Sequence, residues 1–383
     1  MTKLHRQPLD RLLRDAIAAG VAPGIVAGVA RRTGVEYLAA VGARCSDPRL
    51  DMETDSVFRI ASMTKLVTSL AVMMLVEEGK IELDAPFAEY VPGYRQPDVL
   101  ESFDAATKRY ATRPAEAPVT VRGLLAHTAG YGYWFLDAPL LALTRGAPEL
   151  FDPPFLMHAP GRKFAYSSGT DVLGRLFEPV TGMALETFFA ERIFGPLGMA
   201  DTGYSVPADG ARLVTVHARA GGPLEERPNE TRGEAPRGGG GLYSTAPDYL
   251  RLLRLLLNGG ELDGRRLVAR ALAEAIAANQ IGALHAEPQR TALPERSNDF
   301  IFMDGSQKFG CGVMIETRTQ ATGRAAGTFS WGGIYNTYFW VDPRAGIAAV
   351  VLMQTAPFAD PLSVDFYARF ERAVYDCSGR VPG

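Results

Sequence analysis

Ser62 and Lys65 stand three positions apart in the segment Ser62-Met63-Thr64-Lys65. If Ser62 begins a helix, this spacing places both side chains on one face, one turn apart. The amine then lies where it can take the hydroxyl proton, and the first N–H groups of the helix can stabilise an oxyanion. A free lysine has a pKa of about 10.4, so burial must lower this pKa before the amine can act as a base. The pair predicts nucleophilic catalysis by Ser62.

The surroundings of this pair decide its meaning, because a serine at a helix start is usually only an N-cap. Residues from Ser62 to Glu78 are apolar on every side of the expected helix, and Gly79 supplies its end. Such a pattern indicates a buried helix rather than a surface one. Lys65 is then a cation in apolar surroundings, which favours the catalytic interpretation.

The segment from Phe58 to Pro86 resembles the nucleophile helix of class C β-lactamases, DD-peptidases and family VIII carboxylesterases, where Ser-x-x-Lys is the first of three motifs. The second motif, Tyr-x-Asn or Tyr-x-Ser, is matched by Tyr166-Ser167-Ser168. By this resemblance Tyr166 moves a proton between the nucleophile and the leaving group. Ser168 replaces the asparagine of β-lactamases, which weakens the case for a β-lactam amide and makes Ser168 a candidate substrate contact.

The third motif, Lys-Thr-Gly in β-lactamases, is matched by Trp331-Gly332-Gly333, a form seen in family VIII esterases and related acyltransferases. Two glycines allow a strand backbone to approach a ligand closely, so all three residues are candidate substrate contacts. The resemblance implies that the N–H groups of Ser62 and Ile334 form the oxyanion hole. Loss of the lysine removes the cation that holds a carboxylate, which points away from carboxylate-bearing substrates.

One further stretch, residues 121–130, also matches the family and contains His127. Within the family it is a structural landmark, so we expect a structural His127 rather than a catalytic base. Tyr133 falls where related esterases line the pocket and is a candidate substrate contact. The other histidines show no metal-ligand spacing, and we expect no metal and no organic cofactor. The absence of a Gly-x-Ser-x-Gly segment disfavours an α/β-hydrolase with a Ser-His-Asp triad.

The elements that must position these residues follow from periodicity and turn residues. Strands are predicted at 24–29, 36–41, 310–316, 327–331, 335–341 and 347–353. Helices are predicted at 9–18, 62–78, 171–180, 185–193, 247–257 and 366–374. The glycine run at 237–241 is interpreted as a flexible loop before a helix, since it lacks the features of a phosphate-binding loop.

This order predicts an α+β fold of the β-lactamase/transpeptidase-like type, with an antiparallel sheet flanked by helices and built from both chain ends. We expect residues 1–84 and 297–383 to form the sheet domain. Residues 85–296 are expected to form an inserted, mostly helical domain. The resemblance extends from about Leu12 to the C-terminus, with its three motifs in family order.

Composition narrows the classes of partner. The chain has 383 residues, a formal net charge of −3 and 47% hydrophobic residues, which is typical of a globular enzyme and argues against nucleic acid. No apolar run reaches the ~18 to 20 residues of a membrane span, and no secretory signal is evident, so a cytoplasmic location is expected. The scattered cysteines, Cys45, Cys311 and Cys377, indicate neither a disulfide framework nor a zinc site.

Together these observations predict a serine carboxylesterase with a catalytic centre of Ser62, Lys65 and Tyr166. Its partner would be a small-molecule ester with a short to medium acyl group, transferred first to Ser62. An acyltransferase, a β-lactamase or a D-amino-acid peptidase of the same fold remain alternatives. A non-catalytic binding module is a further one, but a module without catalysis has no reason to keep all three residues.

Overall fold

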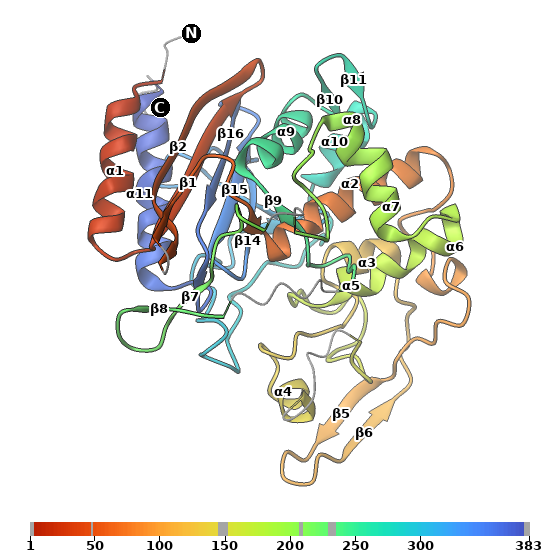
Figure 1. The fold of residues 1–383 in the computed structure, drawn as a ribbon. Helices are drawn as coiled ribbons and strands as arrows, with labels where there is room; N and C mark the ends of the chain where they lie inside the picture. The colour runs from red at the N-terminus through yellow and green to blue at the C-terminus, as the bar shows by residue number, and fades with distance from the viewer. Residues whose placement is uncertain (1–3, 47–48, 145–151, 207–209, 229–234, 379–383) are drawn as a thin grey trace.

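One antiparallel sheet, to which both ends of the chain contribute, organises the molecule (Figure 1). The computed structural model describes residues 4–46, 49–144, 152–206, 210–228 and 235–378. In these residues the sheet has eight strands in the order β12-β13-β14-β15-β16-β1-β2-β3. Their bounds are β1 (Gly24–Arg31), β2 (Gly34–Ser46), β3 (Arg49–Asp51), β12 (Lys308–Phe309), β13 (Met314–Ile315), β14 (Phe329–Gly333), β15 (Thr337–Asp342) and β16 (Ile347–Leu352).

The two ends of the chain meet where β1 pairs antiparallel with β16, with Val26 opposite Leu352. Every residue of β1, β15 and β16 is buried. Strands covered on both faces read as continuous apolar runs rather than alternating ones, as these three do. The predicted α+β fold, with a sheet built from both chain ends, is confirmed.

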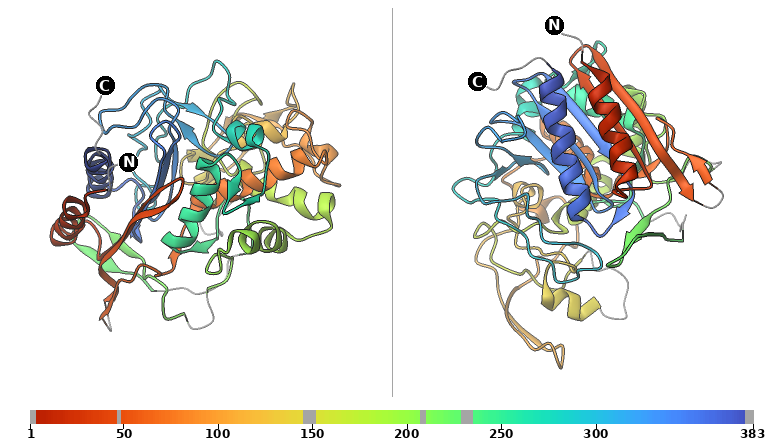
Figure 2. Two further views of the ribbon diagram at one scale, coloured as in Figure 1. Left: turned by 90° about the horizontal axis from the view of Figure 1, so that it is seen from above. Right: turned by 90° about the vertical axis from the view of Figure 1, so that its left-hand side faces the viewer.

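Helices supply the two covering layers. α1 (Arg6–Ala18) and α11 (Pro361–Cys377) lie side by side on one face of the sheet (Figure 2), and α9 (Ala246–Leu257) contacts β1 and β16 from the other. The start of α11 is specified locally, because the Asp360 carboxylate accepts the N–H of Ser363 at 3.2 Å and Pro361 fits the first turn. None of the described helices is both long and apolar enough to cross a bilayer.

The part of the chain between β3 and β12 carries helices separated by loops, α9 among them. Its other helices are α2 (Thr64–Glu77), α3 (Val121–Leu125), α4 (Ala138–Thr144), α5 (Gly169–Leu173), α6 (Phe177–Thr181), α7 (Leu185–Phe189), α8 (Gly195–Leu197) and α10 (Arg270–Ile276). Short strand pairs lie between them, including β4 (Phe58–Arg59) with β9 (Tyr243–Ser244) and β5 (Val99–Phe103) with β6 (Tyr110–Arg113). One hydrophobic cluster runs from the sheet into these helices, and the division into two domains stays a prediction.

The stretch 310–316 differs from its prediction as a single strand. The chain reverses there between β12 and β13, and the N–H of Gly310 donates to the carbonyl of Val313 at 2.8 Å. The next two N–H groups form hydrogen bonds outside the sheet: that of Cys311 donates to the Ile276 carbonyl and that of Gly312 to the Leu125 carbonyl. These bonds come from helices far away in sequence, which is why the local pattern did not reveal the turn.

Candidate active site

Ser62 lies on a single 3₁₀ turn, Ala61–Met63, at the entrance of α2. Ala61 has a φ of 45°, a left-handed conformation that is uncommon outside glycine. The carbonyl of Met63 accepts the hydroxyl of Tyr249 at 2.9 Å, which fixes the turn from the sheet side. Regular α-helix begins only at Thr64, so Ser62 is presented on a sharp turn rather than within the predicted helix.

Lys65 is completely buried, and its amine contacts three oxygens. Nζ lies 3.3 Å from the hydroxyl of Ser62, 2.9 Å from the hydroxyl of Tyr133 and 2.7 Å from the carbonyl of Gly239. These three contacts hold the amine in place, one of them against the hydroxyl of Ser62. Ser62 and Lys65 are three positions apart, and the predicted closeness of their side chains is present in the structure.

Tyr133 connects this lysine to a buried carboxylate that sequence reasoning missed. Its hydroxyl donates to Oδ2 of Asp171 at 3.3 Å, and Asp171 Oδ1 accepts the N–H of Gly239 at 3.1 Å and a guanidinium N–H of Arg237 at 3.2 Å. Burial, and then the negative charge of Asp171, raise the pKa of Tyr133 well above its usual value. Tyr133 is thus held as a neutral phenol beside Lys65.

The glycine run at 237–241 is a packed part of the site, which corrects its interpretation as a flexible loop. The carbonyl of Gly238 accepts the hydroxyl of Thr68 on α2 at 2.6 Å, next to the bond from Lys65 to Gly239. A Cβ added at Gly238 would lie 2.2 Å from the carbonyl oxygen of Thr170. Glycine is needed at this position because the two backbone segments lie too close for a side chain. The sequence alone does not tell such a packed glycine from one in a flexible loop.

Tyr166 lies beneath the lysine, between two other aromatic rings. Its ring centroid is 5.1 Å from Lys65 Nζ, 5.2 Å from the ring of Tyr133 and 4.8 Å from that of Trp331. The indole N–H of Trp331 donates to the Tyr166 oxygen at 3.3 Å, so the phenol's own proton points elsewhere. The structure brings both tyrosines to the amine, but the hydrogen bond to Nζ is made by Tyr133.

His127 and Ser168 hold the loops around these tyrosines. Nδ1 of His127 accepts the N–H of Ser167 at 3.2 Å, and its pKa lies well below the usual value because of burial and then the nearby charge of Lys65. Ser168 is also buried, and its hydroxyl donates to the carbonyl of Gly132 at 3.3 Å. Both contacts are structural in kind, which agrees with the expectation for His127 and leaves a substrate contact by Ser168 a prediction.

The end of β14 approaches the Ser62 turn closely. A Cβ on Gly333 would lie 2.3 Å from the carbonyl oxygen of Ile60 and 2.4 Å from Oγ1 of Thr337. On Gly332 it would lie 2.9 Å from the Thr337 carbonyl oxygen. The two glycines therefore let the strand edge reach the turn that carries Ser62, and the next residue, Ile334, enters the wall of the cavity beside it.

Ser62 opens into a cavity of about 610 Å³. Tyr133 and Ile334 line it, whereas Trp331, Gly332, Gly333 and Ser168 are not in its described wall. Aromatic rings and arginines supply much of that wall: Tyr133, Trp134, Phe135, Tyr243, Tyr335, Arg59, Arg227, Arg237 and Arg296.

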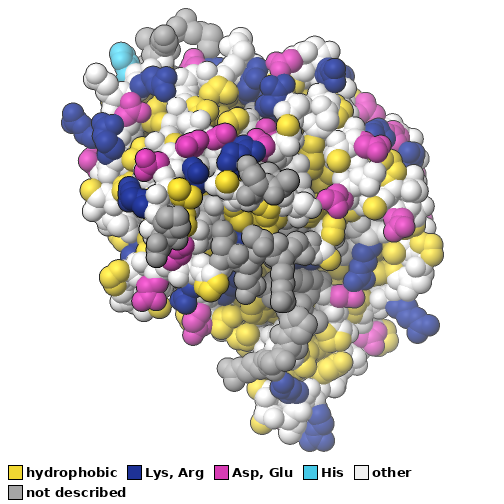
Figure 3. All heavy atoms as spheres, in the orientation of Figure 1, with side chains coloured by type: hydrophobic (Ala, Val, Ile, Leu, Met, Phe, Trp, Pro, Cys, Tyr) yellow, Lys and Arg dark blue, Asp and Glu magenta, His cyan; other side chains and the backbone are white. Residues whose placement is uncertain are grey.

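On the face drawn in Figure 3, charges of both signs are interspersed. No cluster of three or more metal-ligating side chains occurs among the described residues.

Comparison with known proteins places this geometry in context. A family model described as Beta-lactamase matches residues 9–374. Protein Rv1367c of Mycobacterium tuberculosis (strain ATCC 25618 / H37Rv) is 33% identical, over 92% of this chain and 90% of its own. Esterase EstB of Burkholderia gladioli is 30% identical, over 91% and 90%.

Two solved structures cover almost the whole chain. A LovD6 mutant of simvastatin synthase from Aspergillus terreus has a TM-score of 0.83 at 27% identity, covering 97% of this chain and 94% of its own. EstCE1, described as a hydrolase with promiscuous acyltransferase activity, has a TM-score of 0.76 at 25% identity, covering 96% and 97%. The likeness therefore extends to both esterases and acyltransferases.

Proposed function

The chain belongs to the beta-lactamase family, and on that premise we propose that it is a serine carboxylesterase acting on short to medium acyl esters. The observation that carries the proposal is the contact of 3.3 Å between the buried Lys65 amine and the hydroxyl of Ser62, a residue that lines the cavity. Relatives named as esterases support the ester as substrate.

In this proposal the reaction has two halves. Ser62 loses its proton to Lys65 and attacks the ester carbonyl carbon, while the N–H groups of Ser62 and Ile334 receive the negative charge on the carbonyl oxygen. Tyr166 gives a proton to the departing alcohol, which leaves an acyl group on Ser62. Water then attacks the acyl-enzyme by the reverse path, and the carboxylic acid is released.

The two tyrosines have different parts in this scheme. Tyr133 stays protonated because Asp171 accepts its hydroxyl, so it serves to orient the lysine amine. Tyr166 accepts only the Trp331 N–H in the described contacts, which leaves its own O–H available for transfer. The assignment of the shuttle to Tyr166 therefore rests on the resemblance and on this difference between the two hydroxyls.

Acyl transfer to a second alcohol is the alternative favoured by a specific observation. Relatives at 28% identity are named monacolin J acid methylbutanoyltransferases, and they share the chain over 96% of its length. In chemical terms the difference is confined to the second half-reaction, where an alcohol takes the place of water. Supplying a primary alcohol to the acyl-enzyme and measuring the ester formed against the acid released separates the two outcomes.

Labelling with a fluorophosphonate tests the nucleophile directly. We expect one covalent adduct, on Ser62 by mass spectrometry, and none in Ser62→Ala. Loss of a nucleophile costs several orders of magnitude, so kcat for p-nitrophenyl butyrate should fall about 10⁴-fold or more. Ser205→Ala, a serine outside the cavity wall, is the control and should label as the unaltered chain does. Labelling of another serine in the unaltered chain contradicts the proposal.

A further inference from the structure

The turn that carries Ile334 is a three-residue loop, residues 334–336, between β14 and β15. Gly333 pairs with Thr337 across its base, and Asn336 closes it with a φ of 56°. Three-residue hairpin loops commonly end in a left-handed residue, a conformation that asparagine adopts more readily than most residues. The backbone path of the loop therefore depends on Asn336.

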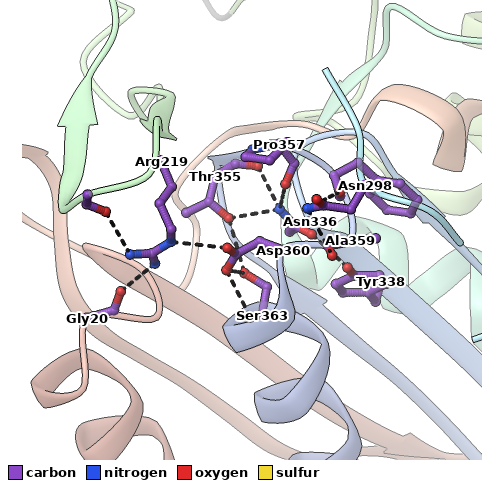
Figure 4. A network of polar contacts seen from close by, with 12 residues as sticks. Gly20, Arg219, Asn298, Asn336, Tyr338, Thr355, Pro357, Ala359, Asp360 and Ser363 are labelled. Carbon is purple, nitrogen blue, oxygen red and sulfur yellow. Dashed lines mark hydrogen bonds and ion pairs between the residues drawn. The ribbon is translucent and has the colours of Figure 1, made fainter. Parts of the chain in front are cut away.

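The side chain of Asn336 is fully buried and bonded at both ends (Figure 4). Nδ2 donates to the Thr355 carbonyl at 2.9 Å, to Thr355 Oγ1 at 3.1 Å and to the Pro357 carbonyl at 2.9 Å. Oδ1 accepts the hydroxyl of Tyr338 at 2.7 Å. This one amide thus ties the loop to the segment 355–357 and to β15.

Two further contacts hold the loop, one at Tyr335 and one at its start, Gly333. The N–H of Thr355 donates at 3.1 Å to the carbonyl of Tyr335, the residue directly after Ile334. At the start of the loop, Gly333 packs against the backbone of Ile60, two residues before Ser62. The position of the Ile334 N–H relative to the nucleophile is therefore set between the Ser62 turn and the segment 355–357.

We propose that Asn336 is a positioning residue of the oxyanion hole, holding the loop so that the N–H groups of Ile334 and Ser62 face the same point. This inference rests on the proposed function, since an oxyanion forms only if Ser62 attacks a carbonyl. Asn336 does not line the cavity, so it acts through the backbone of Ile334. Displacing a donor by about 1 Å removes much of its stabilisation of the transition state.

Asn336→Gly tests this role, because glycine keeps the left-handed φ available and removes every side-chain bond. We expect kcat for p-nitrophenyl butyrate to fall about 10²-fold, with KM within about threefold, since the donor acts on the oxyanion rather than on the bound ester. Thr355→Val removes the bond from Asn336 to Thr355 Oγ1, together with the 3.5 Å contact of that hydroxyl with Ser363, and keeps the side-chain shape. Its kcat should therefore fall less, by about three- to tenfold. It also keeps the test decisive if Asn336→Gly does not fold.

Asn298→Ala is the matched control, because Asn298 belongs to the same polar cluster (Figure 4) and its side chain hydrogen-bonds to residues 358 and 359. Its Nδ2 donates to the carbonyls of Phe358 and Ala359 at 3.4 and 3.3 Å. We expect its kcat to stay within about threefold of the unaltered value, even if its Tm falls.

Two results overturn the positioning role: an unchanged kcat in folded variants of Asn336 or Thr355, or an equal loss of kcat in Asn298→Ala. An unaltered chain that neither turns over the ester nor labels at Ser62 overturns the proposed function, and this role with it. Labelling and turnover of the unaltered chain therefore distinguish the two failures.

Discussion

At the scale of single residues, the site is built around one buried amine. Burial of a polar group without partners is costly, and the Lys65 amine contacts the oxygens of Ser62, Tyr133 and Gly239. Asp171 lies one bond further away and accepts the hydroxyl of Tyr133, so its negative charge stands close to the amine. The same contacts that hold the lysine amine also place it beside the hydroxyl of Ser62.

The roles of Tyr133 and Tyr166 can be distinguished by removing each hydroxyl group in turn. Lys65→Ala and Tyr166→Phe should each lower kcat by at least about 10²-fold, and their double variant should be little worse, because groups that act as a unit are not additive. Tyr133→Phe keeps the ring and loses only the bonds to Lys65 and Asp171, so a loss of about tenfold is expected. Steady-state kinetics with circular dichroism of each variant measure this. A larger loss in Tyr133→Phe than in Tyr166→Phe would make Tyr133 the proton shuttle.

At the scale of elements, the edge of β14 and the turn before α2 must meet without side chains between them. Gly333 makes this contact, with its backbone against Ile60 and Thr337. Strand β14 in turn is paired with β15 through Gly333 and Thr337, which gives the contact a rigid support. Ser62 and the loop after Gly333 are thus placed by two elements that lie far apart in the sequence.

Gly333→Ala should separate these two elements. The added methyl group would lie 2.3 Å from the Ile60 carbonyl oxygen, a backbone atom that no side-chain rotation can move. We expect overpacking to cost about 1–3 kcal/mol of stability and kcat to fall by at least tenfold. Gly34→Ala is the control, since a Cβ there meets nothing within 4 Å. Thermal unfolding and ester kinetics on both variants measure this, and unchanged kcat in Gly333→Ala would show that the edge can shift without moving the donor.

At the scale of the whole molecule, the cavity exists only because the N-terminal strands, the helical middle and the C-terminal strands fold together. Its wall includes Ser62 from the first third of the chain, Tyr243 from the middle and Ile334 from the last. Its volume of about 610 Å³ lies within the range of small-molecule sites. The wall combines aromatic rings, which offer apolar area to a ligand, with arginines.

Substrate class is the prediction that belongs to this scale. The third motif has no lysine, and Trp331 in its place is bonded to Tyr166. A cation at that position stabilises a bound substrate carboxylate by about 1.5 to 3 kcal/mol. Without the cation, kcat/KM for nitrocefin should be about 10- to 100-fold lower than in an enzyme that has it. We expect p-nitrophenyl butyrate to be the better substrate on one preparation. Nitrocefin turnover that equals the ester would instead show that an arginine of the wall replaces the missing lysine.

The sequence by itself determined the elements and the order of the motifs. The apolar runs of β1, β15 and β16 and the Ser62–Lys65 spacing are local patterns, and these strands were predicted close to their observed bounds, whereas α11 extends beyond the predicted 366–374 at both ends. Local patterns suffice here because burial on both faces and helix periodicity leave a direct trace in neighbouring residues. Three motifs in family order then indicated the fold.

Only the tertiary structure decided how the side chains meet. The bond from Lys65 to Gly239 spans 174 positions, and the one from Trp331 to Tyr166 spans 165. Backbone from distant parts of the chain packs against the glycine run at 237–241 and accepts hydrogen bonds from Asn336. The packing of the run and the bonds of the 334–336 loop therefore depend on residues far away in sequence. A residue's type limits which bonds it can make, but its partners are chosen by the packing of elements that the chain brings together from both ends.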